Sequence, residues 1–184
     1  MTMIVKKRTF IVDTIKTVAG LFVTLNFFAC VSIPKGAVAV KPFDQERYLG
    51  TWYEIARFDF TFERGLSHVT ANYSIKSPRV IRVDNKGYQD AKSRWKESVG
   101  KARFVASNDE GRLKVSFFGP FYAGYNVIAL DKQYRYALIA GDNLSYLWIL
   151  SREKTIPETV KNDYLAKAKA LGYDTDKLIW TKQD

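Results

Sequence analysis

The sequence predicts a mainly β fold, either an antiparallel sandwich or a barrel, followed by one helix near the C-terminus. Short β-type segments recur from Thr51 to about Leu150, with turn residues between them. Aromatic residues make up 15% of the chain, which suits strands better than helix bundles. The length of 184 residues fits one compact domain with a short appendage.

Eight strands are predicted from alternation and turn signals. The first covers residues 51–57, and the second, 68–75, places alternate apolar side chains on one face. The third, 80–83, leads to a predicted hairpin turn at 84–87, where the sequence reads Asp-Asn-Lys-Gly. The remaining strands are predicted at residues 95–106, 112–118, 122–131, 134–140 and 145–151.

One helix is predicted between Pro157 and Gly172. Pro157 suits the first turn, Glu158 complements the N-terminal dipole, and Gly172 is placed to end the helix. Its apolar face is formed by Val160, Tyr164, Ala168 and Leu171. A helix after eight strands does not fit inside a small barrel, so we expect it to pack outside. Residues 178–180 then predict a short terminal strand.

The first thirty residues have the pattern of an export signal, and we expect them to lie outside the folded domain. Lys6, Lys7 and Arg8 form a basic start, and no charge appears between Thr17 and Pro34. The apolar run ends at Cys30, the only cysteine, which follows Ala29 and resembles the lipobox of bacterial lipoproteins. That resemblance implies acylation of Cys30.

This interpretation divides the chain into a lipoprotein signal peptide (1–29), a lipidated cysteine with its tether (30–42) and a folded domain (43–184). Val31 is not the Asp that would imply retention in the inner membrane, so the outer membrane is favoured. A plain cleaved signal and an uncleaved anchor remain as alternatives.

Composition and missing motifs exclude several classes of function. A single Cys excludes a disulfide framework and a Cys-based zinc finger, and a single His excludes a multi-histidine metal site. The net charge of +10 is scattered among acidic residues, which fits weak attraction to anionic lipids better than nucleic-acid binding. Neither GxSxG nor a P-loop is present, so we predict no enzyme, no metal and no cofactor.

Three features together resemble the lipocalin family: Gly50-Thr51-Trp52 in the first strand, Arg152 after the eighth strand, and the C-terminal helix. Residues 115–122 and 125–131 are similar to the bacterial outer-membrane members of that family, whose middle motif survives here only as Asp131. The resemblance implies an eight-stranded antiparallel up-and-down calyx barrel with the helix packed outside. It also implies that Trp52 plugs one end with the Arg152 guanidinium lying on its indole.

Candidate ligand contacts follow from the alternation of side chains along strands. If Trp52 points inward, Glu54 and Ala56 share its face. The same count gives Tyr73, Ala102, Phe104, Phe117, Tyr125, Val127, Leu138, Tyr146 and Trp148 as inner-face candidates, with Phe121 and Tyr122 near the open rim. A carboxylate on this face is costly unless paired, hydrated or protonated, so Glu54 is expected to have a partner. Alternatively, it limits how deep an acyl chain enters or disfavours a second negative charge on the ligand.

The resemblance implies binding, storage or transport of fatty acids or lysophospholipids in the barrel. The expected location is the periplasmic face of the outer membrane, attached through Cys30, with a role in membrane maintenance under stress. The alternatives are a carrier of a tetrapyrrole, haem or other apolar pigment, and a structural role with a vestigial calyx. The sequence leaves both a monomer and a homodimer open.

Overall fold

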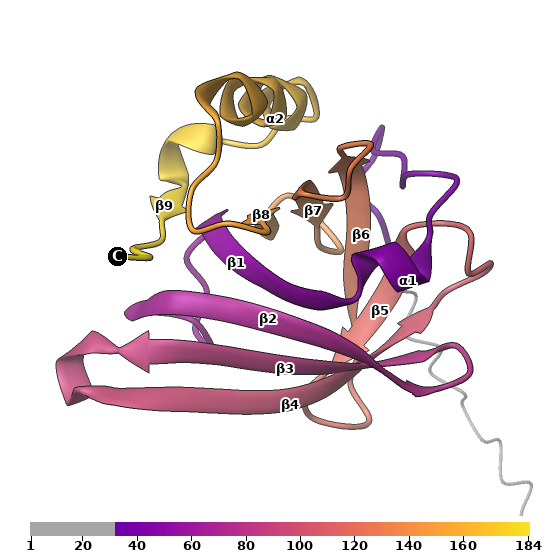
Figure 1. Ribbon diagram of the computed structural model, residues 1–184. Coiled ribbons are helices and arrows are strands. Elements are labelled where there is room, and N and C mark those ends of the chain that lie inside the picture. Colours follow the sequence, from indigo (N-terminus) through magenta and orange to yellow (C-terminus); the bar gives the residue numbers. More distant parts are fainter. Residues whose placement is uncertain (1–31) are drawn as a thin grey trace, which may run out of the picture.

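The computed structural model describes residues 32–184 as an antiparallel sheet closed into a barrel (Figure 1). From β1 to β8, each strand pairs with the next along the chain, and β1 closes the ring by pairing with both β2 and β8. The strands are β1 (Gly50–Arg57), β2 (Leu66–Ser77), β3 (Val80–Gln89), β4 (Arg94–Phe104), β5 (Arg112–Ser116), β6 (Ala123–Leu130), β7 (Tyr136–Ala140), β8 (Leu147–Ser151) and β9 (Ile179–Trp180). The eight-stranded barrel predicted from the sequence is confirmed, and the short β9 lies along β1.

The predicted turn at residues 84–87 is wrong, because β3 runs through it without interruption. Asp84 pairs with Asn72 of β2 on one side and with Val99 of β4 on the other. Hydrogen bonding on both sides outweighs the turn propensity of this segment. The hairpin instead turns at a 3₁₀ helix (Asp90–Lys92), where Ser93 adopts the left-handed conformation with φ of 45°.

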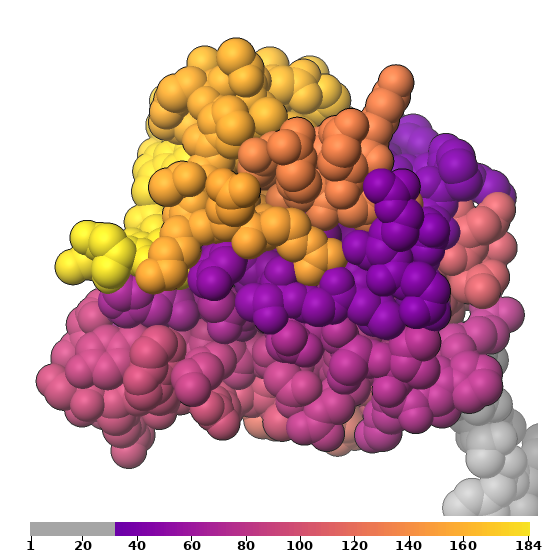
Figure 2. Space-filling view, in the orientation of Figure 1, coloured from indigo at the N-terminus to yellow at the C-terminus, as the bar shows by residue number. Residues whose placement is uncertain are grey.

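Helix α2 (Glu158–Ala170) packs outside the barrel, as predicted, above β1, β7 and β8 (Figure 1). In the space-filling view, the helical and C-terminal residues form a layer above β2, β3 and β4 (Figure 2). Tyr164 and Ala168 are buried, and the Tyr164 hydroxyl donates to the Tyr136 carbonyl at 2.9 Å. Gly172, with φ of 93°, follows the end of the helix, whereas Pro157 is the N-cap and does not lie in the first turn.

Two separate apolar clusters result, one on each face of the sheet. The barrel-interior cluster consists of Phe43, Tyr48, Trp52, Tyr73, Ile81, Val83, Ala102, Phe104, Leu113, Val127, Ala137, Ile139 and Leu150. The helix-side cluster consists of Ile55, Ala56, Phe58, Ala129, Tyr136, Leu138, Ala140, Leu147, Ile149, Tyr164, Ala168, Tyr173 and Leu178. Strands β1, β6, β7 and β8 contribute to both clusters, so an apolar residue on them does not by itself reveal which way it faces.

A short helix that was not predicted from the sequence, α1 (Gln45–Tyr48), precedes β1. Its last residue, Tyr48, contacts Trp52. Asp44 caps the helix by accepting from the Arg47 amide at 3.3 Å. The Trp52 indole donates to the Tyr48 carbonyl at 2.9 Å, and the Arg152 guanidinium lies 4.0 Å from its ring centroid. The Arg152 guanidinium also donates to the carbonyls of Arg47, Tyr48, Leu49, Thr51 and Tyr134.

The C-terminal segment fills a gap between β1 and β2. These two strands pair only over Gly50–Tyr53 and then separate. The Thr181 amide donates to the Ile55 carbonyl at 2.9 Å on one side. The Gln183 side-chain amide donates to the carbonyls of Glu54 and Val69, at 2.8 and 2.9 Å, and so bridges the two strands. The last residues of the chain are therefore part of the barrel wall.

Residues 32–42, which the sequence predicts to be a tether, pack along the barrel wall. The Val40 amide donates to the Val127 carbonyl at 2.8 Å, and the Val40 carbonyl accepts from the Gly111 amide at 2.9 Å. Ala39 is buried. The predicted signal peptide and Cys30 lie outside the described residues. Between residues 32 and 184, no helix has the length and apolar character needed to cross a membrane.

We predict that Arg152→Lys lowers the free energy of unfolding by about 2–3 kcal/mol, because one ammonium cannot replace the bonds of the guanidinium fork or its planar contact with Trp52. Urea denaturation of the variant and the parent chain measures the difference. Arg64→Lys is the matched control, since Arg64 is exposed and, among residues 32–184, its guanidinium pairs with Asp59 alone. Equal losses in the two variants would contradict this role of Arg152.

Candidate ligand site

The end of the barrel next to α1 is a packed aromatic floor. Tyr48 packs against Trp52 with ring centroids 4.8 Å apart, and both side chains are buried. The Tyr125 hydroxyl hydrogen-bonds to the hydroxyls of Tyr48 at 2.7 Å and Tyr73 at 2.8 Å. Burial raises the pKa of all three phenols, so they remain neutral hydrogen-bonding groups at physiological pH. A ligand entering from the other end would meet apolar rings and these hydroxyls.

Beyond the floor, the inner face is less completely covered. Several side chains that pack against the barrel-interior cluster are only partly buried. They are Ala71, Val115, Phe117, Tyr125 and Trp148. The surface that they present is apolar, apart from the Tyr125 hydroxyl and the indole N–H of Trp148. This combination of an apolar wall with few polar groups is typical of a site for a hydrophobic small molecule.

A buried ion pair lies between this apolar wall and the C-terminal segment. Glu54 and Arg57 are 3% and 1% exposed, and Glu54 Oε1 is 2.5 Å from Arg57 Nη1. Thr181 joins the pair, because its hydroxyl donates to Glu54 at 2.6 Å and accepts from Arg57 at 2.9 Å. The expectation that Glu54 has a partner is confirmed.

Arg57 also holds the loop that connects β1 and β2. Its second terminal nitrogen donates to the carbonyls of Glu63 at 2.8 Å and Leu66 at 3.2 Å. Arg57 Nε is buried and has no hydrogen-bond partner among the described residues. That N–H is therefore a donor that a water molecule or a polar ligand group would satisfy.

Glu63 is a second acid in this region, and no pattern in the sequence pointed to it. Its Oε2 accepts from the Trp148 indole at 3.2 Å. Burial raises the pKa of Glu63 well above its ordinary value, and the negative charge of Glu54 raises it further. With Glu63 protonated, the single positive charge of Arg57 balances the single negative charge of Glu54.

Two β-bulges interrupt the alternation of side chains. In the pairing of β1 with β8, Glu54 faces Leu150 and Ala56 faces Ile149, so Ile55 is an extra residue. The bulge turns Ala56 toward the helix-side cluster and Arg57 toward the interior. A second bulge, at Ile128 of β6, places Ala129 in the helix-side cluster although Val127 belongs to the barrel-interior cluster. Strand β7 has no extra residue in this pairing, and Leu138 faces the helix side by regular alternation with the inner Ala137 and Ile139.

The predicted inner-face positions of Ala56 and Leu138 are therefore wrong, because both residues belong to the helix-side cluster. Tyr73, Ala102, Phe104 and Val127 belong to the barrel-interior cluster. Tyr122 packs on the side chains of Lys101 and Lys114, which lie on the opposite face of β4 and β5 from their inner residues. Tyr146 is 37% exposed and stacks on Trp148 with ring centroids 6.2 Å apart. Ligand contact by the inner residues stays a prediction.

A family model described as a lipocalin-like domain matches residues 43–183, nearly all of the folded chain. The chain is a lipocalin. It is 55% identical over 150 residues to the outer membrane lipoprotein Blc of Escherichia coli (strain K12), covering 82% of this chain and 85% of the relative. Blc of Vibrio cholerae is 46% identical over 155 residues, covering 84% of this chain and 91% of the relative.

The fold of this lipocalin is also similar to that of insecticyanin from the tobacco hornworm Manduca sexta. The TM-score is 0.66 at 20% identity, covering 83% of this chain and 87% of the other. Lipocalins bind small hydrophobic molecules in their barrels, so this chain is a binding protein and not an enzyme. The names of its bacterial relatives support attachment as a lipoprotein and association with the outer membrane.

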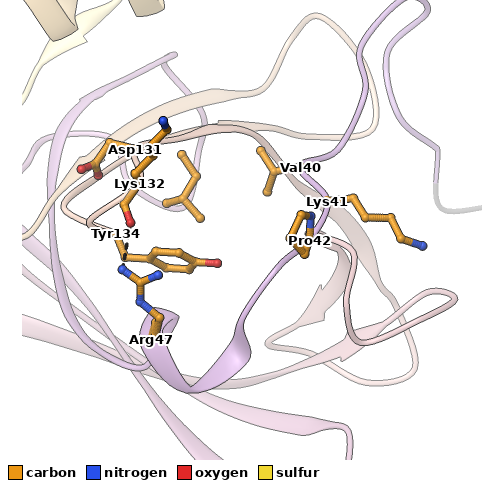
Figure 3. Close-up of a pocket in the computed structure, with 8 residues that line it drawn as sticks. Val40, Lys41, Pro42, Arg47, Asp131, Lys132 and Tyr134 are labelled. Atoms are coloured by element: carbon orange, nitrogen blue, oxygen red, sulfur yellow. Dashed lines mark hydrogen bonds between the residues drawn. The ribbon is translucent and has the colours of Figure 1, made fainter.

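This lipocalin also has a groove of about 470 Å³ on the outside of the barrel (Figure 3). Its side chains already bind one another: the Arg47 guanidinium lies 4.2 Å from the Tyr134 ring centroid and donates to the Lys132 carbonyl at 2.8 Å. Asp131, the remnant of the family's middle motif, accepts from the amides of Gln133, Arg135 and Tyr136 and so holds the turn before β7. We therefore interpret this groove as a structural feature of the turn.

Glu63→Gln is expected to change how stability depends on pH. A carboxyl whose pKa is raised by folding contributes stability below its ordinary pKa, which for glutamate is 4.5, and loses it as the pH rises through the folded pKa. The neutral amide avoids this loss. At pH 8 the free energy of unfolding of the variant should therefore exceed that of the parent by about 1.4 kcal/mol for each unit by which folding raises the pKa. At pH 4 the two proteins should have similar stability.

Urea denaturation at several pH values measures this difference. Glu97→Gln is the matched control, because Glu97 is exposed and pairs with Lys86 on the surface. Parallel pH profiles for the Glu63 variant and the parent would show that Glu63 does not titrate abnormally.

Proposed function

We propose that this lipocalin binds one fatty acid or lysophospholipid with its acyl chain inside the barrel and its polar head at the open end. The observation that supports this proposal is an apolar barrel interior that is closed at one end. Trp52 and Tyr48 are buried at the closed end, whereas Phe117 and Trp148, nearer the other end, are only partly buried. A long, narrow acyl chain matches such a space, and its polar head would remain near water.

The charges at the open half favour a zwitterionic lysophospholipid over a free fatty acid. Arg57 is largely neutralised by Glu54, and Glu63 adds a carboxyl next to Trp148. An ammonium group would favour ionised Glu63, whereas a fatty carboxylate would add a further negative charge to two acids. The free N–H of Arg57 is a donor suited to a phosphate oxygen.

The proposed location is the periplasmic face of the outer membrane, with attachment through acylated Cys30. Relatives named outer membrane lipoprotein support this placement. The proposed role is storage or shuttling of membrane lipids during envelope stress. Formation of a homodimer stays a prediction.

Native mass spectrometry of residues 31–184 with lysophosphatidylethanolamine, oleate and haem tests the ligand class. We expect a one-to-one complex with the lysophospholipid, a weaker one with oleate, and loss of both in Phe117→Asp, which places a charge on the apolar inner wall. Phe121→Ser is the matched control, because Phe121 is 77% exposed and lies outside the barrel-interior cluster.

A complex with haem alone would favour the pigment-carrier alternative. If none of the three compounds bound, the proposed ligand class would be wrong while the family assignment remained. Stronger binding of oleate than of the lysophospholipid would refute the preference assigned to Glu54, Arg57 and Glu63.

A further inference from the structure

Exposed aromatic side chains gather at the open end of the barrel. In an up-and-down barrel, the β1–β2, β5–β6 and β7–β8 loops lie at one end, opposite the end where α1 leads into β1. Phe62 of the first loop is 60% exposed, and Phe118 and Phe121 of the second are 62% and 77% exposed. We call these three residues the rim aromatics. Large exposed aromatic side chains that form a group mark an interaction surface.

Two of the rim aromatics are in ring contact, and the third lies in the same turn as one of them. The rings of Phe62 and Phe118 stack with centroids 5.6 Å apart, although they come from different loops. The Phe121 amide donates to the Phe118 carbonyl at 3.1 Å, which keeps Phe121 in the same turn.

Positive charges border this patch. Lys96 donates to the Phe62 carbonyl at 2.7 Å. Lys101 and Lys114 lie 5.7 and 5.1 Å from the ring centroid of Tyr122, the residue that follows Phe121. The neighbouring acid, Asp142, is engaged by the amides of Gly124 and Ser32. Aromatic rings beside lysines suit the interface of an anionic phospholipid bilayer, since rings enter the headgroup region and ammonium groups meet phosphates.

The N-terminal segment reaches this same end of the barrel. The Ser32 hydroxyl donates to the Asp142 carbonyl at 2.7 Å, and the Ser32 carbonyl accepts from the Asn126 side chain at 3.1 Å. The Ser32 carbonyl also lies against Gly124, which is only three residues after Phe121. Cys30 precedes Ser32 by two residues, and two residues span at most about 7 Å. An acyl anchor on Cys30 would therefore enter the membrane beside the rim aromatics.

We propose that the rim aromatics and their lysines form a docking surface for the anionic phospholipid bilayer, so that the open end of the barrel faces the membrane. Ligand then passes between bilayer and barrel without crossing bulk water. This inference rests on the anchor at Cys30 in the proposed function, but it concerns the orientation of the domain, which an anchor alone leaves free.

The acylated full-length mature protein provides the test, since acylation blocks the thiol of the only native cysteine. A Phe121→Cys variant carries an environment-sensitive fluorophore, and the protein is reconstituted in vesicles of phosphatidylethanolamine and phosphatidylglycerol containing a spin-labelled lipid. We expect quenching several-fold stronger than for the same fluorophore on Ser77→Cys, which is exposed at the opposite end of the barrel. Flotation of the vesicles reports the anchor separately.

Protein that floats with equal quenching at both positions would refute the docking surface and leave the anchor in place. Protein that does not float would contradict both. Cross-linking between two copies through position 121, without quenching, would assign the patch to a second copy of this chain.

A second experiment measures transfer of a lysophospholipid from vesicles to the protein. The double variant Phe118→Ser, Phe121→Ser should slow this transfer several-fold and leave the affinity for the lysophospholipid in detergent-free solution unchanged. An unchanged transfer rate would also refute the proposal.

Discussion

The buried pair of Glu54 and Arg57 is the constraint around which the open half of the barrel is arranged. Removing two charges from water costs several kcal/mol for each ion, and the cost is offset only when geometry and hydrogen bonding are nearly complete. Here the carboxylate has the guanidinium and the Thr181 hydroxyl, while the guanidinium also has two loop carbonyls. Loss of either partner would leave the other charge buried alone, so the β1–β2 loop and the C-terminal segment are tied to the same pair.

This arrangement links stability to the proposed binding. The loop carbonyl that Arg57 holds belongs to Glu63, whose side chain reaches Trp148 on the inner wall. The loop thus brings a second acid next to an ion pair that is already neutral. Burial raises the pKa of Glu63, and the charge of Glu54 raises it further. A cationic head group would balance the negative charge of ionised Glu63. The same loop carries Phe62 to the rim, so the inner wall and the rim surface share one structural support.

Alternation and turn residues predicted a sandwich or barrel with an outer helix, because they are local signals. The resemblance to lipocalins added the closed barrel and the contact of Trp52 with Arg152. The prediction from the sequence missed Arg57 and misplaced Ala56 because a β-bulge shifts alternation without leaving a mark in composition. The turn predicted at 84–87 failed because pairing with two neighbouring strands outweighs the preferences of four residues. Residues 32–42 resembled a linker, yet Val40 forms backbone hydrogen bonds with Val127 of β6 and with Gly111 just before β5, and such bonds require no particular side chain.

In the proposed complex, one acyl chain lies inside the barrel with its head next to Glu63 and Trp148. Intermolecular nuclear Overhauser effects between residues 31–184 and lysophosphatidylethanolamine test it most directly. We expect contacts from the terminal methyl of the acyl chain to the rings of Tyr73 and Tyr125, and from the head-group methylenes to Trp148. Contacts from the acyl chain to Ile128 and Val160, which line a groove on the helix side of the sheet, would contradict it.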